Sequence, residues 1–299
     1  MSATFVAPTS LDEVLLAMAA GARPVAGGTD LVVGARQGKK PLPESLVAIH
    51  LLDELRTITH TETGLRIGAL VSHEQIIADA TILSAFPALA DASGIVGSHA
   101  TRAHGTLGGN VMTASPAMDT GAPLICFGAV AILQSASGTR SVLVEDLWTG
   151  PGKTVANPDE LLVAIELPTP IADTSSCYVR LEYRRQMEIA IVGAGAQLTV
   201  VDGIITDARI AMTAVTATIR RIAAAEQALI GSSGNREAAA LAAAAVGEAC
   251  TPISDVRGSA TYRRAMVAVI ARRAIEAAFT RATGGTVPIP ASPALHGAS

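Results

Sequence analysis

A glycine pair next to a threonine and an aspartate has the residue types that bind an anion. The segment reads Ala26-Gly27-Gly28-Thr29-Asp30, after an expected strand and before the apolar run 31–33. Adjacent glycines let backbone N–H groups converge on an anion, and the threonine hydroxyl adds a donor. The segment therefore suits a diphosphate. The alternative is a tight strand-to-helix turn in which Thr29 or Asp30 is the N-cap.

A second glycine pair follows about eighty residues later, at Thr106-Leu107-Gly108-Gly109-Asn110. Two such segments, each with a threonine and an amide or carboxylate side chain, are able to close on one extended ligand. A dinucleotide has that shape. The alternative is that the second pair turns a corner of the chain, with Asn110 in the left-handed region.

Two other patterns resemble nucleotide motifs and fail on inspection. Gly152-Lys153-Thr154 has the end of a P-loop, but Leu147 stands where the first glycine is required. Gly193-Ala194-Gly195 resembles the start of a dinucleotide fingerprint, but Leu198 replaces the third glycine and a strand follows where a helix is needed. The sequence therefore predicts no NAD site. It also shows no Ser-His-Asp, Cys-His or paired-carboxylate grouping, so no catalytic side chain is assigned.

The composition favours a globular protein and disfavours nucleic-acid binding. Hydrophobic residues make up 49% of the 299 and charged residues 16%, so the chain has enough apolar residues for two or three subdomains. The net charge of −4 provides no basic field for a phosphate backbone.

The cysteine positions and the N-terminus bear on cofactors and location. Cys126, Cys177 and Cys250 lie far apart, which excludes a disulfide framework and the spacing of an iron–sulfur or zinc site. Any iron–sulfur cluster is therefore expected on another chain.

The N-terminus has no basic stretch followed by an apolar one, and no window approaches roughly 18–20 continuous apolar residues. We expect a cytoplasmic protein without a transmembrane segment.

Hydrophobic periodicity predicts which elements position the two glycine segments. Ser72 and Gln75 form a capping box that predicts a helix through Asp79. The glycine-rich stretch 97–112 has no clear period and is expected to be a loop. Other helices are expected at 11–20 and 86–96, and strands at 23–26, 45–50, 65–69, 130–134, 140–144 and 161–167.

A boundary is expected at Pro168-Thr169-Pro170, before a second domain. Strands at 177–182, 194–201 and 204–212 are followed by helices at 219–230, 236–250 and 259–280, which is an α+β arrangement. Asp202-Gly203 predicts a hairpin between the last two strands. The last helix is expected to place its large apolar residues on one face: Tyr262, Met266, Val269, Ile270 and Phe279.

Taken together, the motifs resemble the FAD-binding, or medium, subunits of molybdenum hydroxylases, the family of carbon monoxide dehydrogenase and xanthine dehydrogenase. The resemblance runs from about Phe5 to about Ala278, and the order and spacing of its motifs make it specific. These motifs are A-G-G-T-D at 26–30, T-R at 101–102, T-L-G-G-N at 106–110, S-P-A-M-D at 115–119, R-R-Q-M-E-I-A at 184–190 and G-S-A-x-Y-R-R at 258–264.

The resemblance implies a two-lobed FAD-binding fold of the vanillyl-alcohol-oxidase type and a C-terminal α+β domain. The FAD-binding domain is expected over 1–170, with lobes of about 1–55 and 56–170, and the C-terminal domain over 171–285, followed by a tail, 286–299. The cofactor-binding residues carried over are Ala26, Gly27, Gly28, Thr29, Asp30, Thr101, Arg102, Thr106, Leu107, Gly108, Gly109, Asn110, Asp119, Leu161, Leu162 and Arg180.

Some of these positions depart from the family pattern. Arg180 stands where xanthine dehydrogenases carry a flavin-contacting lysine. The positive charge is therefore kept, but the side-chain geometry is not. The apolar contact falls on Leu161 or Leu162, one residue apart. His99 and His104 replace other polar residues, which leaves covalent flavin attachment or a metal site as alternatives. Because medium subunits of this type hold FAD without a covalent bond, non-covalent FAD is expected.

The implied function is electron relay. FAD accepts electrons from a 2Fe–2S cluster on a small subunit and passes them to a terminal acceptor, while molybdenum and the substrate are on a large subunit. A dimer of heterotrimers is the expected assembly. Arg184 and Arg185 face an anionic acceptor or partner, or form a solvated ion-paired surface. Two other functions stay open, a stand-alone flavin oxidase or reductase of the same fold and an assembly protein without flavin.

Overall fold

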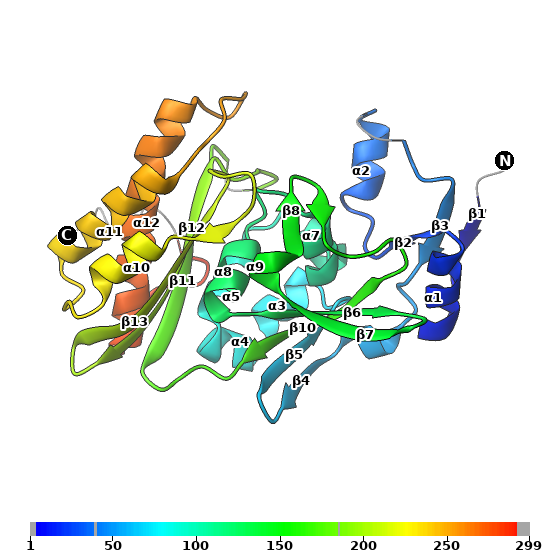
Figure 1. The fold of residues 1–299 in the computed structure, drawn as a ribbon, viewed down its shortest axis with the longest axis horizontal. Coiled ribbons are helices and arrows are strands. Elements are labelled where there is room, and N and C mark those ends of the chain that lie inside the picture. Colours follow the sequence, from blue (N-terminus) through cyan, green and yellow to red (C-terminus); the bar gives the residue numbers. More distant parts are fainter. Residues whose placement is uncertain (1–3, 39–40, 185, 292–299) are drawn as a thin grey trace.

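The computed structural model describes residues 4–38, 41–184 and 186–291. Three sheets follow one another along the long axis of the molecule, from the N-terminal end to the C-terminal end (Figure 1). The N-terminal and central parts contain the two glycine segments. The C-terminal part packs against the central helices. It also contacts residues that lie close to the second segment.

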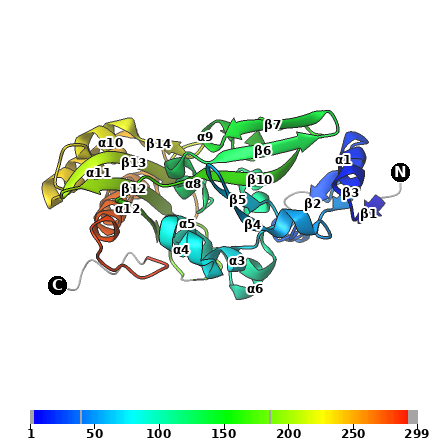
Figure 2. The same cartoon turned by 90° about the horizontal axis from the view of Figure 1, so that it is seen from below.

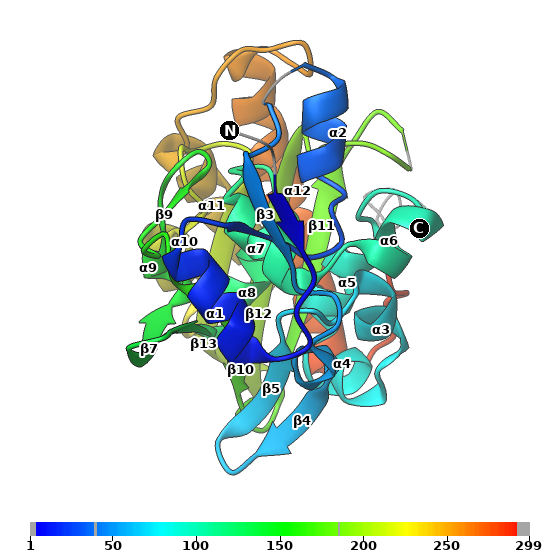
Figure 3. The same cartoon turned by 90° about the vertical axis from the view of Figure 1, so that its right-hand side faces the viewer.

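The N-terminal part is a parallel sheet of three short strands in the order β1-β3-β2. Its helix α1 begins at a capped residue, since the Ser10 hydroxyl accepts from the backbone N–H of Glu13, and it buries Val14, Leu15 and Met18. Helix α2 has no buried residue and stands away from the sheet (Figure 3). The elements are β1 (Thr4–Val6), α1 (Leu11–Ala19), β2 (Arg23–Val25), α2 (Leu31–Arg36), β3 (Ser45–Ala48) and the short helix η1 (Asp53–Arg56).

The central part is an antiparallel sheet in the order β4-β5-β10-β6-β7. Helices α3 to α6 lie on one side of this sheet (Figure 2). Its strands are β4 (Ile58–Thr61), β5 (Gly64–Gly68), β6 (Val130–Ser135), β7 (Gly138–Leu143) and β10 (Leu161–Pro168), with β8 (Trp148–Gly150) and β9 (Lys153–Thr154) as a separate pair. Its helices are α3 (His73–Ala78), α4 (Ala80–Ala85), α5 (Pro87–Gly94), α6 (His99–His104), α7 (Leu107–Thr113), α8 (Gly121–Phe127) and α9 (Val144–Leu147).

The C-terminal part is a four-stranded antiparallel sheet covered by three helices (Figure 1). The hairpin predicted at Asp202-Gly203 is confirmed, because both residues have positive φ, 51° and 78°, as a tight two-residue turn requires. The elements are β11 (Thr174–Leu181), β12 (Val192–Val201), β13 (Ile204–Thr213), β14 (Arg220–Arg221), α10 (Ala223–Leu229), α11 (Arg236–Ala249) and α12 (Ala260–Ala282). The predicted α+β arrangement is confirmed. The boundary expected at 168–170 begins at the last residue of β10 and continues into the connection to β11, and the domain limits stay predictions.

The face predicted for the last helix is confirmed in part. Ile270 is buried, and Met266 and Phe279 pack partly buried against the same core. Tyr262 is 40% exposed, however, and small residues take up much of the buried stripe of α12. These are Ala271, Ala274, Ala277 and Ala278, with Val267 and Ile275. Small residues let the helix approach β11 and β12 closely, so residue size, and not only apolar character, decides which face is buried.

A buried ion pair connects the central and C-terminal parts. The Asp91 carboxylate, on α5, accepts two hydrogen bonds from the Arg281 guanidinium of α12, at 2.7 and 3.0 Å. It also accepts from the backbone N–H groups of Tyr178 and Ala291. Asp91 is 0% exposed. A buried carboxylate with four donors is fully satisfied and ties α5, β11, α12 and the C-terminal segment together.

The three cysteines are buried separately in the cores. Burial raises the pKa of the Cys126 thiol to about 12 and raises the pKa of Cys177 well above its ordinary value. Neither thiol is therefore ionised at neutral pH. None of the described helices is long and apolar enough to cross a bilayer.

Candidate functional site

The two glycine segments lie against each other in the structure. A Cβ atom placed on Gly27 would lie 1.9 Å from the backbone oxygen of His104, so the first segment touches the residue pair that precedes the second. The Thr113 hydroxyl, at the end of α7, donates to the Asp30 carboxylate at 3.1 Å. The two segments are therefore adjacent, as binding of a single extended ligand requires.

The first segment has the free amides that an anion site needs. It leaves β2 at Val25, turns through Gly28, whose φ is +69°, and enters α2. Among the described residues, no acceptor takes a hydrogen bond from the backbone N–H groups of residues 27–30. Consecutive unpaired amides in a tight turn favour a bound anion such as a diphosphate.

The Asp30 side chain does not cap helix α2. Asp30 occupies the N-cap position of α2, but its carboxylate makes no capping hydrogen bond there. It accepts from Thr113 instead. The segment is a strand-to-helix turn. Its Asp30 carboxylate contacts Thr113 of α7, and no described residue accepts from the backbone N–H groups of residues 27–30.

The second segment is helical, so the prediction of a loop over 97–112 is wrong. Two N-caps outweigh the low helix propensity of glycine: the Ser98 hydroxyl accepts from Thr101 N–H at 3.3 Å, and the Thr106 hydroxyl accepts from Gly109 N–H at 3.1 Å. Asn110 lies inside α7, and its φ is not positive. The alternative of a corner with Asn110 in the left-handed region is therefore also wrong.

The amides of the second segment are used within the protein. Leu107 N–H donates to Val71 O at 2.9 Å, and Gly108 N–H donates to Ala69 O at 3.0 Å. A Cβ on Gly108 would lie 2.7 Å from that same Ala69 oxygen. Gly108 is therefore required for close packing on the strand end, and the second segment offers a ligand its side chains, not an amide cradle.

The partly exposed residues of α7 provide those side chains. Asn110 is half-buried and Thr113 is exposed. The Asn110 carbonyl oxygen accepts from the Thr120 hydroxyl at 2.6 Å, which orients its amide group. Thr113 was missed from sequence, although it lies four residues after Gly109 and so shares its helix face.

Helix α6 contributes a buried cation beside the second segment. Arg102 is 6% exposed and donates to Val96 O at 3.2 Å, with His99 Nδ1 at 3.0 Å. Among the described residues no partner bonds its Nε, and Glu74 is 3.9 Å away. Thr101 is half-buried, and its hydroxyl lies 3.6 Å from Met187 Sδ.

His73 lies beneath this helix and is expected to make stability depend on pH. Burial, and then the Arg102 charge, lower the pKa of His73 from 6.5 to about 4. The unfolded chain therefore binds the extra proton between these values. The neutral ring contributes its full stability above pH 6.5, and this contribution falls by roughly 3 kcal/mol as the pH decreases towards 4.

The measurement is the free energy of unfolding against pH for the natural chain and for His73→Gln. We expect the variant to have the shallower slope between pH 6.5 and 4. His50→Gln, at an exposed position, serves as the control and should leave the slope unchanged. Parallel curves for the natural chain and His73→Gln would exclude this role.

Asp119 and Arg180, both predicted to contact FAD, form a buried ion pair. Arg180 Nη1 lies 2.7 Å from Asp119 Oδ2, and the two residues are 2% and 6% exposed. The Tyr178 hydroxyl donates to Asp119 at 2.7 Å. Burial raises the pKa of Asp119, and the Arg180 charge opposes that rise. Contact of either residue with FAD stays a prediction.

Leu161 and Leu162 are both buried in β10, at 4% and 2% exposure. They belong to different hydrophobic cores, because successive strand residues point to opposite faces. Which of the two contacts the cofactor stays open.

The two glycines of Gly193-Ala194-Gly195, which resembles the start of a dinucleotide fingerprint, are explained by packing. A Cβ on Gly193 would lie 2.2 Å from the Tyr178 hydroxyl, and one on Gly195 would lie 3.2 Å from the Ala122 backbone.

The two histidines of α6 do not converge on a metal. His99 is paired with Arg102, and among the described residues no three His, Cys, Asp or Glu side chains gather as a metal site. Arg184 pairs with Glu188 at 3.0 Å and is 68% exposed, while Arg185 lies outside the described residues.

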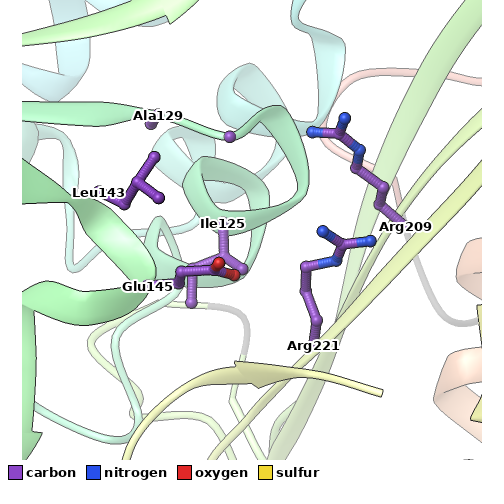
Figure 4. Close-up of a pocket in the computed structure, with 7 residues that line it drawn as sticks. Ile125, Ala129, Leu143, Glu145, Arg209 and Arg221 are labelled. Carbon is purple, nitrogen blue, oxygen red and sulfur yellow. The ribbon is translucent and has the colours of Figure 1, made fainter. Parts of the chain in front are cut away.

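A separate pocket lies near α8, between β7 and β13 (Figure 4). Arg221 is paired with Glu226 at 2.8 Å, and Arg209 donates to Cys126 O at 3.3 Å. These guanidinium groups already have protein acceptors, and neither glycine segment lines the pocket. We therefore place the site at the glycine segments. The pocket is lined by Ile125, Gly128, Ala129, Leu143, Glu145, Arg209 and Arg221.

Comparison with known families gives two adjoining matches. Residues 1–170 match the family described as the FAD binding domain in molybdopterin dehydrogenase. Residues 178–278 match the CO dehydrogenase flavoprotein C-terminal domain. The first match contains both glycine segments.

Individual relatives match over most of their length. The carbon monoxide dehydrogenase medium chain of Afipia carboxidovorans is 32% identical, over 87% of this chain and 90% of its own. The xanthine dehydrogenase FAD-binding subunit of Escherichia coli O157:H7 is 30% identical, over 90% and 93%. A chain of carbon monoxide dehydrogenase from Hydrogenophaga pseudoflava superimposes with a TM-score of 0.89 at 30% identity, covering 94% of this chain and 98% of its own.

Proposed function

Because the chain belongs to the FAD-binding medium subunits of molybdenum hydroxylases, we propose that it relays electrons through non-covalent FAD. The electrons come from a 2Fe–2S cluster on a small subunit and leave to a terminal acceptor. Oxidation of the substrate takes place at molybdenum on a large subunit. The chain is thus the flavoprotein part of an oxidoreductase.

The observation that carries the proposal is the set of backbone N–H groups at residues 27–30, from which no residue in the described part of the chain accepts a hydrogen bond. They suit the diphosphate of FAD, and α7 lies close enough to hold the rest of the molecule, since Thr113 is bonded to Asp30. FAD supplies the electron storage that no side chain provides. The residues of this chain bind and orient it: the first segment by its amides, the second by Asn110 and Thr113.

The same geometry favours a relay over a self-contained oxidase. An oxidase needs an acid or base that reaches the reacting substrate. Asp30 is bonded to Thr113, and Asp119 is buried and bonded to Tyr178 and Arg180. Glu188 is paired with Arg184, whose side chain lowers the pKa of that carboxyl, and Glu182 is bonded to Arg180.

The proposed partners follow from the relatives' names, which describe medium chains and FAD subunits of dehydrogenases. A small iron–sulfur subunit and a large molybdenum subunit complete the assembly, as a dimer of heterotrimers in the cytoplasm. No substrate is assigned, because relatives with carbon monoxide, xanthine and nicotinate in their names are similarly close.

Native purification of the assembly from cells that produce this chain tests the proposal. We expect stoichiometric FAD together with iron and molybdenum in one large complex, and flavin that enters the supernatant when the protein is precipitated with acid. FAD without iron or molybdenum would replace the relay with a stand-alone flavin enzyme. A complex without flavin would overturn the proposal, and flavin that stays on the polypeptide would overturn its non-covalent part.

A further inference from the structure

We propose that Arg180 is a positioning residue: it fixes the loop 182–190 against α6, and this loop slows the release of FAD. The inference rests on the function proposed above. The loop joins β11 to β12, is described except for Arg185, and is called the rim loop below.

Arg180 reaches both ends of the rim loop. Its Nε donates to Glu182 Oε2 at 2.6 Å, where the loop begins, and its Nη1 lies 3.3 Å from the Glu188 backbone oxygen, near where the loop ends. A planar guanidinium with several fixed donors is suited to hold two chain segments at once.

The same guanidinium is tied to the segment that follows α7. Its Nη1 donates to Asp119 at 2.7 Å, and Asp119 also accepts from the Tyr178 hydroxyl at 2.7 Å. Arg180 is 2% exposed. Because these acceptors occupy its donors inside the protein, the role that we assign to Arg180 is to hold the loop and not to contact the cofactor.

The rim loop in turn lies on α6, beside the two glycine segments. Met187 N–H donates to Gly97 O at 3.0 Å, and the Thr101 hydroxyl lies 3.6 Å from Met187 Sδ. Arg184 Nη2 donates to Met187 O at 3.0 Å. Met187 has a φ of +53°, a conformation that a methionine keeps only when its surroundings impose it.

These contacts make a continuous path from the buried ion pair to the proposed cofactor site. Arg180 holds the rim loop in place, and the rim loop positions Met187 against α6. The backbone oxygen of His104, the last residue of α6, lies against Gly27. Met187 is 59% exposed, so the rim loop is at the surface where it contacts α6. Loosening the loop is therefore expected to speed FAD release more than it affects the cores.

The test measures the release rate of FAD from the purified assembly, by transfer to an excess of a flavin-binding apoprotein. The double variant Arg180→Gln, Asp119→Asn removes one buried positive and one buried negative charge together and leaves the partly exposed Glu182 carboxylate without its guanidinium partner. We expect release roughly tenfold faster, the effect of losing one hydrogen bond to a charged group. Arg184→Ala, at an exposed position, should act in the same direction. Amide hydrogen exchange should rise in residues 186–190.

Tyr178→Phe is the matched control, because it removes a hydrogen bond to the same Asp119 without touching the rim loop. Its release rate should stay within about twofold of the natural rate. Natural release rates in both Arg180→Gln, Asp119→Asn and Arg184→Ala would overturn the inference, as would equal acceleration in Tyr178→Phe. If the natural assembly holds no FAD, the proposed function fails first, so the two failures are distinguishable.

Discussion

Gly27→Ala is expected to abolish FAD binding and leave the fold intact. The new methyl group would lie 1.9 Å from the His104 oxygen and 2.7 Å from its carbonyl carbon. Both atoms belong to the backbone, so no side chain is able to turn away, and the two glycine segments must separate. We expect an affinity loss of at least about a hundredfold, or about 3 kcal/mol. The measurement is flavin content and a fluorescence titration with FAD.

Gly34→Ala is the matched control, since a Cβ at Gly34 meets nothing within 4 Å and the residue lies in α2. It should bind FAD like the natural chain. Thermal unfolding of the flavin-free proteins, followed by circular dichroism, should be similar for both variants because Gly27 belongs to none of the hydrophobic cores. Bound FAD would itself raise the stability of the variant that keeps it. Natural affinity in Gly27→Ala would show that the contact between the segments does not matter for FAD.

Asp91→Asn should cost about 3–5 kcal/mol of the free energy of unfolding, the range for breaking a buried ion pair by removing one partner. Asp91 is 0% exposed and the Arg281 side chain is 7% exposed. The substitution leaves the buried Arg281 guanidinium without its countercharge. It also replaces the carboxylate that accepts from Tyr178 N–H and Ala291 N–H with a weaker acceptor. Urea unfolding measured by circular dichroism provides the value.

An exposed ion pair provides the comparison. Arg66 and Glu166 lie 2.6 Å apart with side chains 37% and 39% exposed. Glu166→Gln should therefore cost less than about 1 kcal/mol. If Asp91→Asn were no more costly than Glu166→Gln, the Asp91 and Arg281 pair would not be what joins α5 to α12.

Much of the fold could be predicted where neighbouring residues determine the structure. The Ser72 and Gln75 capping box is present in full, and the Asp202-Gly203 hairpin forms as predicted. The short strands β1, β4, β8, β9 and β14 were not predicted, because they have two to four residues and exist only through their partners. The helix predicted at 219–230 is wrong at its start, since β14 occupies residues 220–221 and α10 begins at Ala223. Helices α6 and α7 were taken for a loop, because glycine propensity was weighed without the caps that compensate for it.

Contact of the predicted site residues with FAD stays a prediction, but the structure shows how these residues are arranged. Pattern alone marked both glycine segments as able to close on one extended ligand, and the resemblance to a family identified that ligand as FAD. The contact of Gly27 with His104 depends on how separate parts of the chain pack, which local sequence does not encode. The same holds for the hydrogen bonds of the Arg180 guanidinium with Asp119 and Glu182, while the flavin contact expected for Arg180 stays a prediction.

The separate burial of Cys126, Cys177 and Cys250 has a practical consequence for labelling. Because the chain presents no exposed thiol, a single cysteine introduced on the surface, for example at Leu241, which is 60% exposed, would be the one that reacts with maleimide. A spin label or fluorophore attached there would report from one known place, with all natural residues other than that one retained.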